Sequence, residues 1–118
     1  MTERTIITQF SDRNEFKNLI ENHEGVVIVK FGAEWCAPCK SIKDYVHEKY
    51  SKLPDNIIVA ELDIDEDGND DVFTYLKSPK LPSFFSFVNG DKMDIYIGTN
   101  RSELDAFFSK CEAHDGAF

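Results

Sequence analysis

The chain has 118 residues, of which 42% are hydrophobic and 10 are phenylalanine, enough for one hydrophobic core and too few for two. Its 13 basic and 22 acidic residues give a net charge of −9, which repels phosphate backbones and anionic lipid surfaces. We therefore expect one globular domain that binds neither nucleic acid nor membranes.

The N-terminus and the cysteine pattern bear on where the protein works. Residues 1–16 contain no apolar run of signal-peptide length, and no window approaches the roughly 18 to 20 apolar residues of a membrane span. Two of the three cysteines form the C-x-x-C pair of Cys36 and Cys39. In a reducing compartment such a pair is more often catalytic or metal-binding than part of a disulfide scaffold. We expect a cytoplasmic protein whose chemistry centres on this pair.

The first half of the chain predicts two strands, each followed by a helix. Residues 4–8 are a candidate strand, and Ser11 is the expected N-cap of the first helix. Residues 26–31 are β-branched and almost continuously apolar, which is typical of a strand covered on both faces, although this strand contains Lys30. A second helix should begin near Cys36. Its apolar stripe, at i, i+4, i+8 and i+11, consists of Ile42, Val46, Tyr50 and Leu53.

The second half predicts three more strands. Residues 57–64 form the first of them, and the acidic turn that follows suits the start of a short helix. The apolar residues of this helix are Val72, Phe73 and Leu76. Residues 83–88 and 92–98 predict two antiparallel strands, because the Asn89-Gly90 step between them is a strong signal for a type I′ hairpin turn.

The last helix completes the order of elements. Asn100, with Glu103 three residues later, resembles a capping box. The apolar stripe of this helix consists of Leu104, Phe107, Phe108 and Cys111. The order β-α-β-α-β-α-β-β-α predicts an α/β fold with a central mixed sheet flanked by helices. We assign residues 1–111 to a single domain and residues 112–118, which lack periodicity, to a short polar tail that frays.

The sequence around the cysteine pair suits thiol chemistry. A thiol attacks a disulfide only as the thiolate, so a redox site must lower the pKa of one cysteine from its usual value of about 8.5. A helix N-terminus does so with its unpaired N–H groups and its dipole, and WCAPCK places Cys36 at such an end. Cys39, one helical turn later, lies close enough to form a disulfide with it. Pro38 lacks an N–H group and suits the first turn.

Three segments together resemble thioredoxin over nearly the whole domain. They are FGAEWCAPCK (31–40) after a buried strand, Leu81-Pro82 before SFFSFVNG, and the Gly98 region before the last helix. The resemblance implies the thioredoxin fold, with Cys36 as the attacking nucleophile and Cys39 as the resolving cysteine that releases the reduced substrate from a mixed disulfide.

The resemblance also implies roles for neighbouring residues. Trp35 would shape the substrate surface beside the pair. Pro82 would be a cis proline packed against the cysteines, leaving the adjacent backbone free to pair with an extended substrate segment. Only about 5 to 6% of X-Pro bonds in folded proteins are cis, so this expectation depends on the resemblance alone.

The function implied is that of a thiol-disulfide oxidoreductase that reduces protein disulfides through a reversible Cys36–Cys39 disulfide. The same resemblance implies no bound cofactor and a separate thioredoxin reductase-like enzyme, NADPH-linked, that regenerates the dithiol. We also expect a monomer. Two alternatives stay open. One is a docking module in a larger complex, with cysteines that are idle or only stabilise the fold, and the other is a more oxidising enzyme similar to disulfide isomerases.

Three departures from thioredoxins concern the backbone near the site. Thioredoxins usually have Gly at the position of Ala37, and Ala restricts the backbone without adding a polar group, so we expect a reductant. The proline that often kinks the helix after the cysteines is Asp44 here, so we expect no kink. The segment 65–82 is longer than usual and contains an extra Pro79, which alters the substrate-facing rim.

A fourth departure concerns charge. Thioredoxins typically have a buried Asp at the position of Lys30, where it assists deprotonation of the resolving cysteine, and a Lys at the position of Glu61. With the signs exchanged, Lys30 and Glu61 would form an ion pair that avoids the several kcal/mol cost of an unpaired buried ion. We hypothesise that Lys30 favours the Cys39 thiolate and makes the site somewhat more oxidising. A neutral Lys30 acting as a base is the rival hypothesis.

The remaining candidates have structural explanations. A metal site needs four ligands, and beyond the cysteine pair the chain has none at the required spacing, so we predict no metal. Cys111 lies on the apolar stripe of the last helix and should be a packed core thiol. We assign no role to the three histidines, which are His23, His47 and His114.

Overall fold

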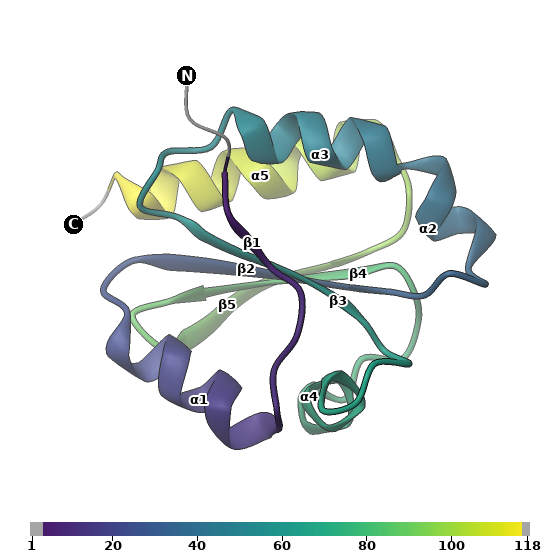
Figure 1. Cartoon of the computed structure of the whole chain (residues 1–118). Helices are drawn as coiled ribbons and strands as arrows, with labels where there is room; N and C mark the ends of the chain where they lie inside the picture. Colours follow the sequence, from purple (N-terminus) through teal and green to yellow (C-terminus); the bar gives the residue numbers. More distant parts are fainter. Residues whose placement is uncertain (1–3, 117–118) are drawn as a thin grey trace.

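The computed structural model describes residues 4–116 and contains a five-stranded mixed sheet in the order β1-β3-β2-β4-β5. The elements in chain order are β1 (Ile6–Ile7), α1 (Arg13–Asn22), β2 (Val26–Gly32), α2 (Ala37–Ser41), α3 (Lys43–Ser51), β3 (Ile58–Asp63), α4 (Asn69–Leu76), β4 (Ser83–Val88), β5 (Asp91–Ile97) and α5 (Arg101–Asp115). Helices α3 and α5 cover one face of the sheet, α1 and α4 cover the other, and α2 projects at one end (Figure 1). The predicted α/β architecture is confirmed.

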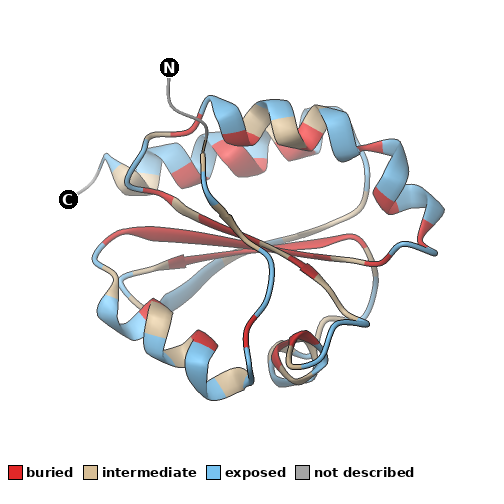
Figure 2. Ribbon diagram, in the orientation of Figure 1, coloured by how far each residue is buried: buried red, intermediate tan, exposed pale blue. Residues whose placement is uncertain are grey.

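Strand β2 is the centre of the fold. It pairs parallel with β3 and antiparallel with β4, and every residue from Val26 to Phe31 is buried (Figure 2). Side chains alternate along a strand. Val26 and Ile28 therefore join the core under α3 and α5, while Val27 and Val29 join the core on the α1 and α4 face. By the same alternation, Lys30 points to the α3 and α5 side.

The expected β4–β5 hairpin is confirmed. Asn89 and Gly90 have φ angles of 51° and 89°, as both central residues of a type I′ turn require. The Phe-rich β4 supplies both cores, because Phe84 packs under α5 and Phe85 and Phe87 pack on the other face. The predicted apolar stripe of α5 is buried, and its Phe107 and Phe108 pack against the ring of Phe84.

The N-cap of α1 is Asp12, so our assignment of Ser11 was wrong. The Asp12 carboxylate accepts the backbone N–H of Glu15 at 3.0 Å, which is the bond that an N-cap residue makes to the third helical residue. Ser11 takes the reciprocal position, since its backbone N–H donates to Glu15 Oε1 at 3.2 Å.

The expectation of an unkinked helix after the cysteines was also wrong. The helical segment is divided into α2 and α3 at Ile42, whose φ and ψ of −110° and 2° are not helical, and α2 tilts away from α3 (Figure 1). The break occurs without a proline, at a residue that is itself buried. Ile42 and Val46 belong to the core under the sheet face, whereas Cys39 is buried beside Ala33 at the end of β2, so the two parts of the segment pack in different places.

The C-terminal boundary differs from our assignment of a polar tail at 112–118. Helix α5 continues to Asp115, so residues 112–115 form its last turn, and residues 117–118 lie outside the described part of the chain. His114 Nε2 lies 3.0 Å from Asp94 Oδ2, and Asn56 contacts the carboxylate of Asp115. These tertiary contacts hold a turn whose sequence has no apolar periodicity.

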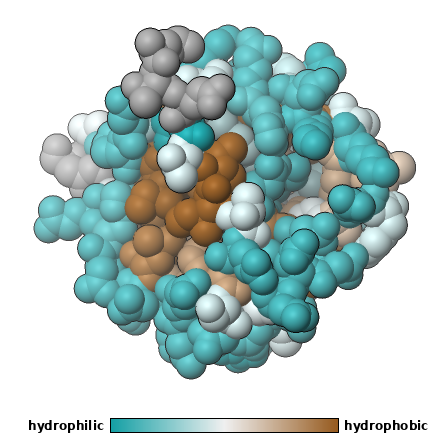
Figure 3. Space-filling model, viewed as in Figure 1, coloured by the Kyte–Doolittle hydropathy of each residue, from teal (hydrophilic) through white to brown (hydrophobic). Residues whose placement is uncertain are grey.

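The face seen in Figure 3 is mostly hydrophilic, with apolar side chains gathered around its centre, where β1 lies in Figure 1. Strand β1 has only two residues, so this edge of the sheet is incompletely covered. The apolar residues that line the cavity here are Ile6, Ile7, Ile57 and Ile58. Within residues 4–116, no helix is long and apolar enough to cross a membrane.

Candidate active site

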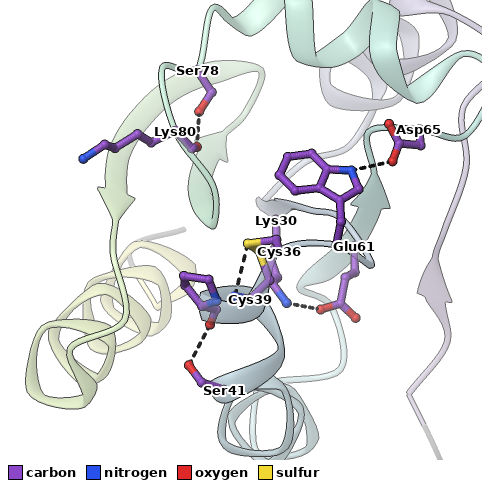
Figure 4. The surroundings of a disulfide bond; sticks show 10 residues. Lys30, Cys36, Cys39, Ser41, Glu61, Asp65, Ser78 and Lys80 are labelled. Atoms are coloured by element: carbon purple, nitrogen blue, oxygen red, sulfur yellow. Dashed lines mark hydrogen bonds and ion pairs between the residues drawn. A yellow bond between two sulfur atoms is a disulfide. The ribbon is translucent and has the colours of Figure 1, made fainter.

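The two cysteines lie where β2 ends and α2 begins, and they form a disulfide with a Cα–Cα distance of 5.3 Å. Cys36 is the N-cap of α2, and its Sγ accepts the backbone N–H of Cys39 at 3.2 Å (Figure 4). Pro38 occupies the first turn, where a missing N–H costs no hydrogen bond. The local sequence therefore places one sulfur against the unpaired N–H groups of a helix end, where a thiolate is stabilised.

The two cysteines face different cavities, although each is only 5% exposed. Cys36 borders an open apolar groove of about 590 Å³. Its other lining residues are Trp35, Ala37, Pro38, Ile64, Phe73, Pro79, Lys80 and Leu81. Cys39 instead borders a second cavity of about 570 Å³, together with Lys30 and Glu61. The two sulfurs thus border cavities of different character, apolar for Cys36 and charged for Cys39.

Trp35 forms the exposed rim of the Cys36 groove. The residue is 67% exposed, and its indole N–H donates to Asp65 Oδ2 at 2.8 Å (Figure 4). This bond holds a large apolar ring beside the disulfide. Sequence reasoning identified Trp35 and missed Asp65, because the acidic turn offered several carboxylates without a signal to choose among them.

The opposite rim comes from the segment before β4. The Leu81–Pro82 peptide bond is cis, as the resemblance implied, and Leu81 packs against Cys36 and Cys39. Pro82 is buried, and its carbonyl accepts the N–H of Gly98 at 3.3 Å. Pro79 lines the groove, where the longer segment was expected to change the rim.

The expected pair of Lys30 and Glu61 is present. Lys30 is only 4% exposed, and its Nζ donates to Glu61 Oε1 at 2.8 Å. The other carboxylate oxygen, Oε2, lies 2.6 Å from Nε2 of His47 on α3. Burial by itself would raise the pKa of Glu61, but the charges and hydrogen bonds of Lys30 and His47 outweigh it and hold that pKa below its usual value.

Lys30 and Cys39 are neighbours across Gly32. A Cβ placed on Gly32 would lie 3.6 Å from Cys39 Sγ and 4.0 Å from Lys30 Cε, so both groups border the space that this glycine leaves open. Figure 4 shows Lys30 beside Cys39 and directed toward Glu61. The ammonium group is therefore part of the electrostatic environment of Cys39.

Tyr50 completes the surroundings of Glu61. It is fully buried, and its hydroxyl has no hydrogen-bond partner among the described residues. Burial, followed by the nearby Glu61 charge, raises the pKa of Tyr50 well above its usual value, so the ring stays neutral. Tyr50 was predicted as a core residue. The position of its hydroxyl near Glu61 was not predicted, because an apolar stripe indicates only which face of the helix is buried.

His47 is the functional candidate that sequence reasoning rejected. It lies on α3 beside the buried Val46, and its ring is half-exposed. The only available signal was its place on the helix that follows the cysteines, and the contact with Glu61 depends on how α3 is rotated over β3.

Cys111 is a buried core thiol as predicted, and burial, together with the charge of Asp94, raises its pKa to about 12.

A reversible disulfide at a helix N-terminus, beside an open groove at the end of a central strand, defines the class of thiol-disulfide oxidoreductases. A family model described as Thioredoxin matches residues 7–110, and the chain belongs to this family. Within residues 4–116, no group of three or more His, Cys, Asp or Glu side chains could hold a metal ion. Family members use the cysteine pair itself as the redox group.

The relatives agree over almost the full length of the chain. Thioredoxin from Equus caballus is 33% identical over 105 residues, which cover 86% of this chain and 94% of the relative. Mitochondrial thioredoxin from Mus musculus is 30% identical over 112 residues, covering 92% of this chain and 66% of that protein. The structure of thioredoxin from Malassezia sympodialis is 29% identical with a TM-score of 0.76, covering 95% of this chain and 97% of that one. The protein is a thiol-disulfide oxidoreductase with protein-disulfide reductase activity, the general function of thioredoxins.

Proposed function

We propose that Cys36 is the nucleophile and Cys39 the resolving cysteine in the reduction of disulfides in partner proteins. The observation that carries this assignment is the separation of the two sulfurs, since Cys36 is the one that borders the apolar groove beside the exposed Trp35. Cys39 borders the cavity of Lys30 and Glu61, on the other side of the pair. A protein substrate reaches the first sulfur and leaves the second for the intramolecular step.

The reaction proceeds in two exchanges. The Cys36 thiolate attacks one sulfur of the substrate disulfide, so that a mixed disulfide forms and the other substrate sulfur leaves as a thiolate. The Cys39 thiolate then attacks Cys36 Sγ, which breaks the mixed disulfide and releases the second substrate thiolate. The substrate gains two electrons and then two protons, and the enzyme is left with the Cys36–Cys39 disulfide.

The groove supplies the substrate surface. Trp35 and Pro38 border it on the cysteine side, and Leu81 borders it on the side of the cis peptide bond. An extended segment of a substrate would lie across these apolar side chains, next to Cys36. The resemblance to thioredoxins supports Pro82 as the residue that shapes the backbone at this position.

The oxidised pair must receive two electrons before the next cycle. We propose that a separate NADPH-dependent reductase of the thioredoxin reductase type supplies them, as the family membership supports. Both cysteines and both rims of the groove come from one chain, so a monomer suffices for the reaction.

We also propose a cytoplasmic location, where reductases keep thiols reduced. Imaging or fractionation of the full chain tests this, since the mouse relative is mitochondrial.

Lys30 adjusts the redox balance in this proposal. Lys30 and Cys39 border one cavity and the space beside Gly32, and a positive charge there favours a thiolate over a neutral thiol or a disulfide. The reduced pair is therefore stabilised, which makes the site somewhat more oxidising than one with an acid at this position. Equilibration with glutathione measures this potential and distinguishes a reductant from an isomerase-like oxidant.

Dithiothreitol-driven reduction of insulin tests the proposed function. We expect activity in the wild-type chain, none above background in Cys36→Ser, and a trapped mixed disulfide between Cys36 and the substrate in Cys39→Ser. Mass spectrometry identifies the trapped cysteine. Equal rates in wild type and Cys36→Ser would support a docking module with idle cysteines, and trapping through Cys39 in a Cys36→Ser chain would reverse the assigned roles.

A further inference from the structure

We propose that His47 is a positioning residue for the redox step: through Glu61 it sets the net charge beneath Cys39, and its protonation favours the reduced cysteine pair. The inference rests on the proposed function, because it assigns a pH response to the same site. It concerns a histidine that touches neither the cysteines nor the substrate groove.

The chain of contacts is short and specific. His47 Nε2 lies 2.6 Å from Glu61 Oε2, and Glu61 Oε1 accepts Lys30 Nζ at 2.8 Å. The His47 side chain is 39% exposed while the Lys30 side chain is 5% exposed. Glu61 therefore connects a buried cation near Cys39 to a histidine whose ring solvent can reach.

The net charge of this cluster depends on His47. With a neutral imidazole, Lys30 and Glu61 cancel, whereas a protonated imidazole leaves one positive charge. The disulfide carries no charge, and the reduced pair becomes negative when one thiol ionises. A net positive charge nearby therefore stabilises the reduced pair relative to the disulfide.

The other groups around His47 keep a constant charge near neutrality. Arg4, Tyr50 and Asp55 line the cavity that His47 borders, and the Arg4 guanidinium is already engaged by backbone carbonyls of residues 50–57. Lysines and acids surround the cavity on the Cys39 side, namely Glu34, Lys40, Lys43, Asp63 and Glu66. Arg, Lys, Asp, Glu and Tyr side chains ordinarily do not change charge between pH 5 and 8, whereas histidine does.

The two effects must be equal by linkage. If protonation of His47 raises the equilibrium constant for reduction by some factor, reduction raises the proton affinity of His47 by the same factor. The charge acts across two hydrogen bonds from a half-exposed ring, where solvent screens it partly. We expect about a threefold factor, which equals about 14 mV for a two-electron couple.

The first test measures the redox equilibrium with glutathione between pH 5.5 and 8 in wild type, His47→Gln and His114→Gln. The control is matched because His114 also pairs with a carboxylate, Asp94, near the end of α5 that lies opposite α2 (Figure 1). We expect wild type to favour the reduced pair by up to about threefold more than His47→Gln does, at those pH values where His47 is protonated while one thiol is ionised. The His114→Gln profile should follow wild type, and identical profiles in all three would overturn the proposal.

The second test needs no variant. The midpoint of the His47 ring titration, followed by NMR in the oxidised and reduced forms of the full chain, should shift so that the reduced form binds the proton about threefold more tightly. The His114 midpoint should not move. Equal His47 midpoints in both redox states would refute the coupling even if insulin reduction is normal, whereas an inactive wild-type chain would count against the proposed function instead.

Discussion

Lys30 of β2 and Glu61 of β3 are register partners in the parallel strand pair, and their charged groups meet at 2.8 Å. The pair places a cation in the core beside Cys39, where a nearby charge affects the ionisation of the thiol. Burying two charges is costly, and removing one partner leaves the other uncompensated, which typically costs about 3–5 kcal/mol. Replacing both by uncharged side chains of similar size is often neutral.

Stability should therefore follow a double-mutant cycle. We expect Glu61→Gln to lower the free energy of unfolding by about 3 kcal/mol, because Lys30 then lacks its carboxylate. Adding Lys30→Met should recover most of this loss. Urea unfolding measures both, and Glu48→Gln, which breaks the exposed pair with Lys52, is the control with little effect. If the double variant were no more stable than Glu61→Gln, the two side chains would not be coupled.

The redox potential should respond to the sign of the charge. The variant Lys30→Asp/Glu61→Lys keeps an ion pair and reverses its direction, so that an acid lies beneath Cys39. We expect the reduced pair to be disfavoured by about tenfold, which is about 30 mV toward a more reducing potential. Equilibration with glutathione measures it. A potential that is unchanged or more oxidising would contradict the role of Lys30 and would favour the rival hypothesis of a neutral lysine acting as a base.

Gly32 and Gly68 should tolerate alanine very differently. At Gly32 the new Cβ would make ordinary contacts, 3.6 Å to Cys39 Sγ and 4.0 Å to Lys30 Cε. A strand glycine also costs about 0.5–1 kcal/mol relative to alanine. We expect Gly32→Ala to be folded and at least as stable as wild type in urea unfolding.

Gly68→Ala is the contrasting variant. Gly68 has φ +92°, and a Cβ there would lie 2.0 Å from the carbonyl oxygen of Phe10. The backbone at Phe10 would have to move to make room for it. We expect a clear loss of stability. Equal stabilities of the two variants would contradict the prediction that the backbone around Gly68 leaves no room for a side chain.

The sequence predicted those elements whose boundaries carry local signals. Strand β4 matches the predicted residues 83–88 at both ends, because Pro82 precedes it and the Asn89-Gly90 turn follows it. The break at Ile42 was not predictable, because the sequence lacks the proline that would mark it and the two parts of the segment differ only in their tertiary packing. In the same way, α5 extends to Asp115 through contacts with Asp94 and Asn56.

The residues of the active site also differ in how far the sequence predicts them. Cys36, Cys39 and Pro38 follow from one contiguous motif, and Lys30 and Glu61 follow from the pairing of two predicted strands. His47 and Asp65 belong to the site through the rotation of a helix and the path of a turn, which no periodic pattern encodes. The part of the site that gives the chemistry is local in sequence, and the part that adjusts its charge is tertiary.

Acid should remove the stabilisation that Glu61 provides. Its pKa in the folded protein lies below the ordinary value of 4.5, so the contribution is complete above pH about 4.5 and is lost as the pH falls through the folded pKa. Between pH 5 and pH 3 we expect the melting temperature of wild type to fall by more than that of Lys30→Met/Glu61→Gln, because only wild type loses the contribution of Glu61. A difference that is constant over this range would show that Glu61 does not titrate with a depressed pKa.

Cys111 should be chemically silent in the folded protein. Burial and the charge of Asp94 raise its pKa to about 12, and a hydrogen bond with Ser86 offsets this only in part. At pH 8 only about one thiol in ten thousand is then a thiolate, and the buried sulfur is also closed to reagents. In the variant Cys36→Ser/Cys39→Ser we expect no reaction with an aromatic disulfide reagent under native conditions and one equivalent in concentrated guanidinium chloride. Adding Cys111→Ala should abolish the second signal. Rapid native labelling would mean that α5 opens readily and that Cys111 is available to oxidants, whereas its silence leaves the Cys36–Cys39 pair as the reactive thiols of the described chain.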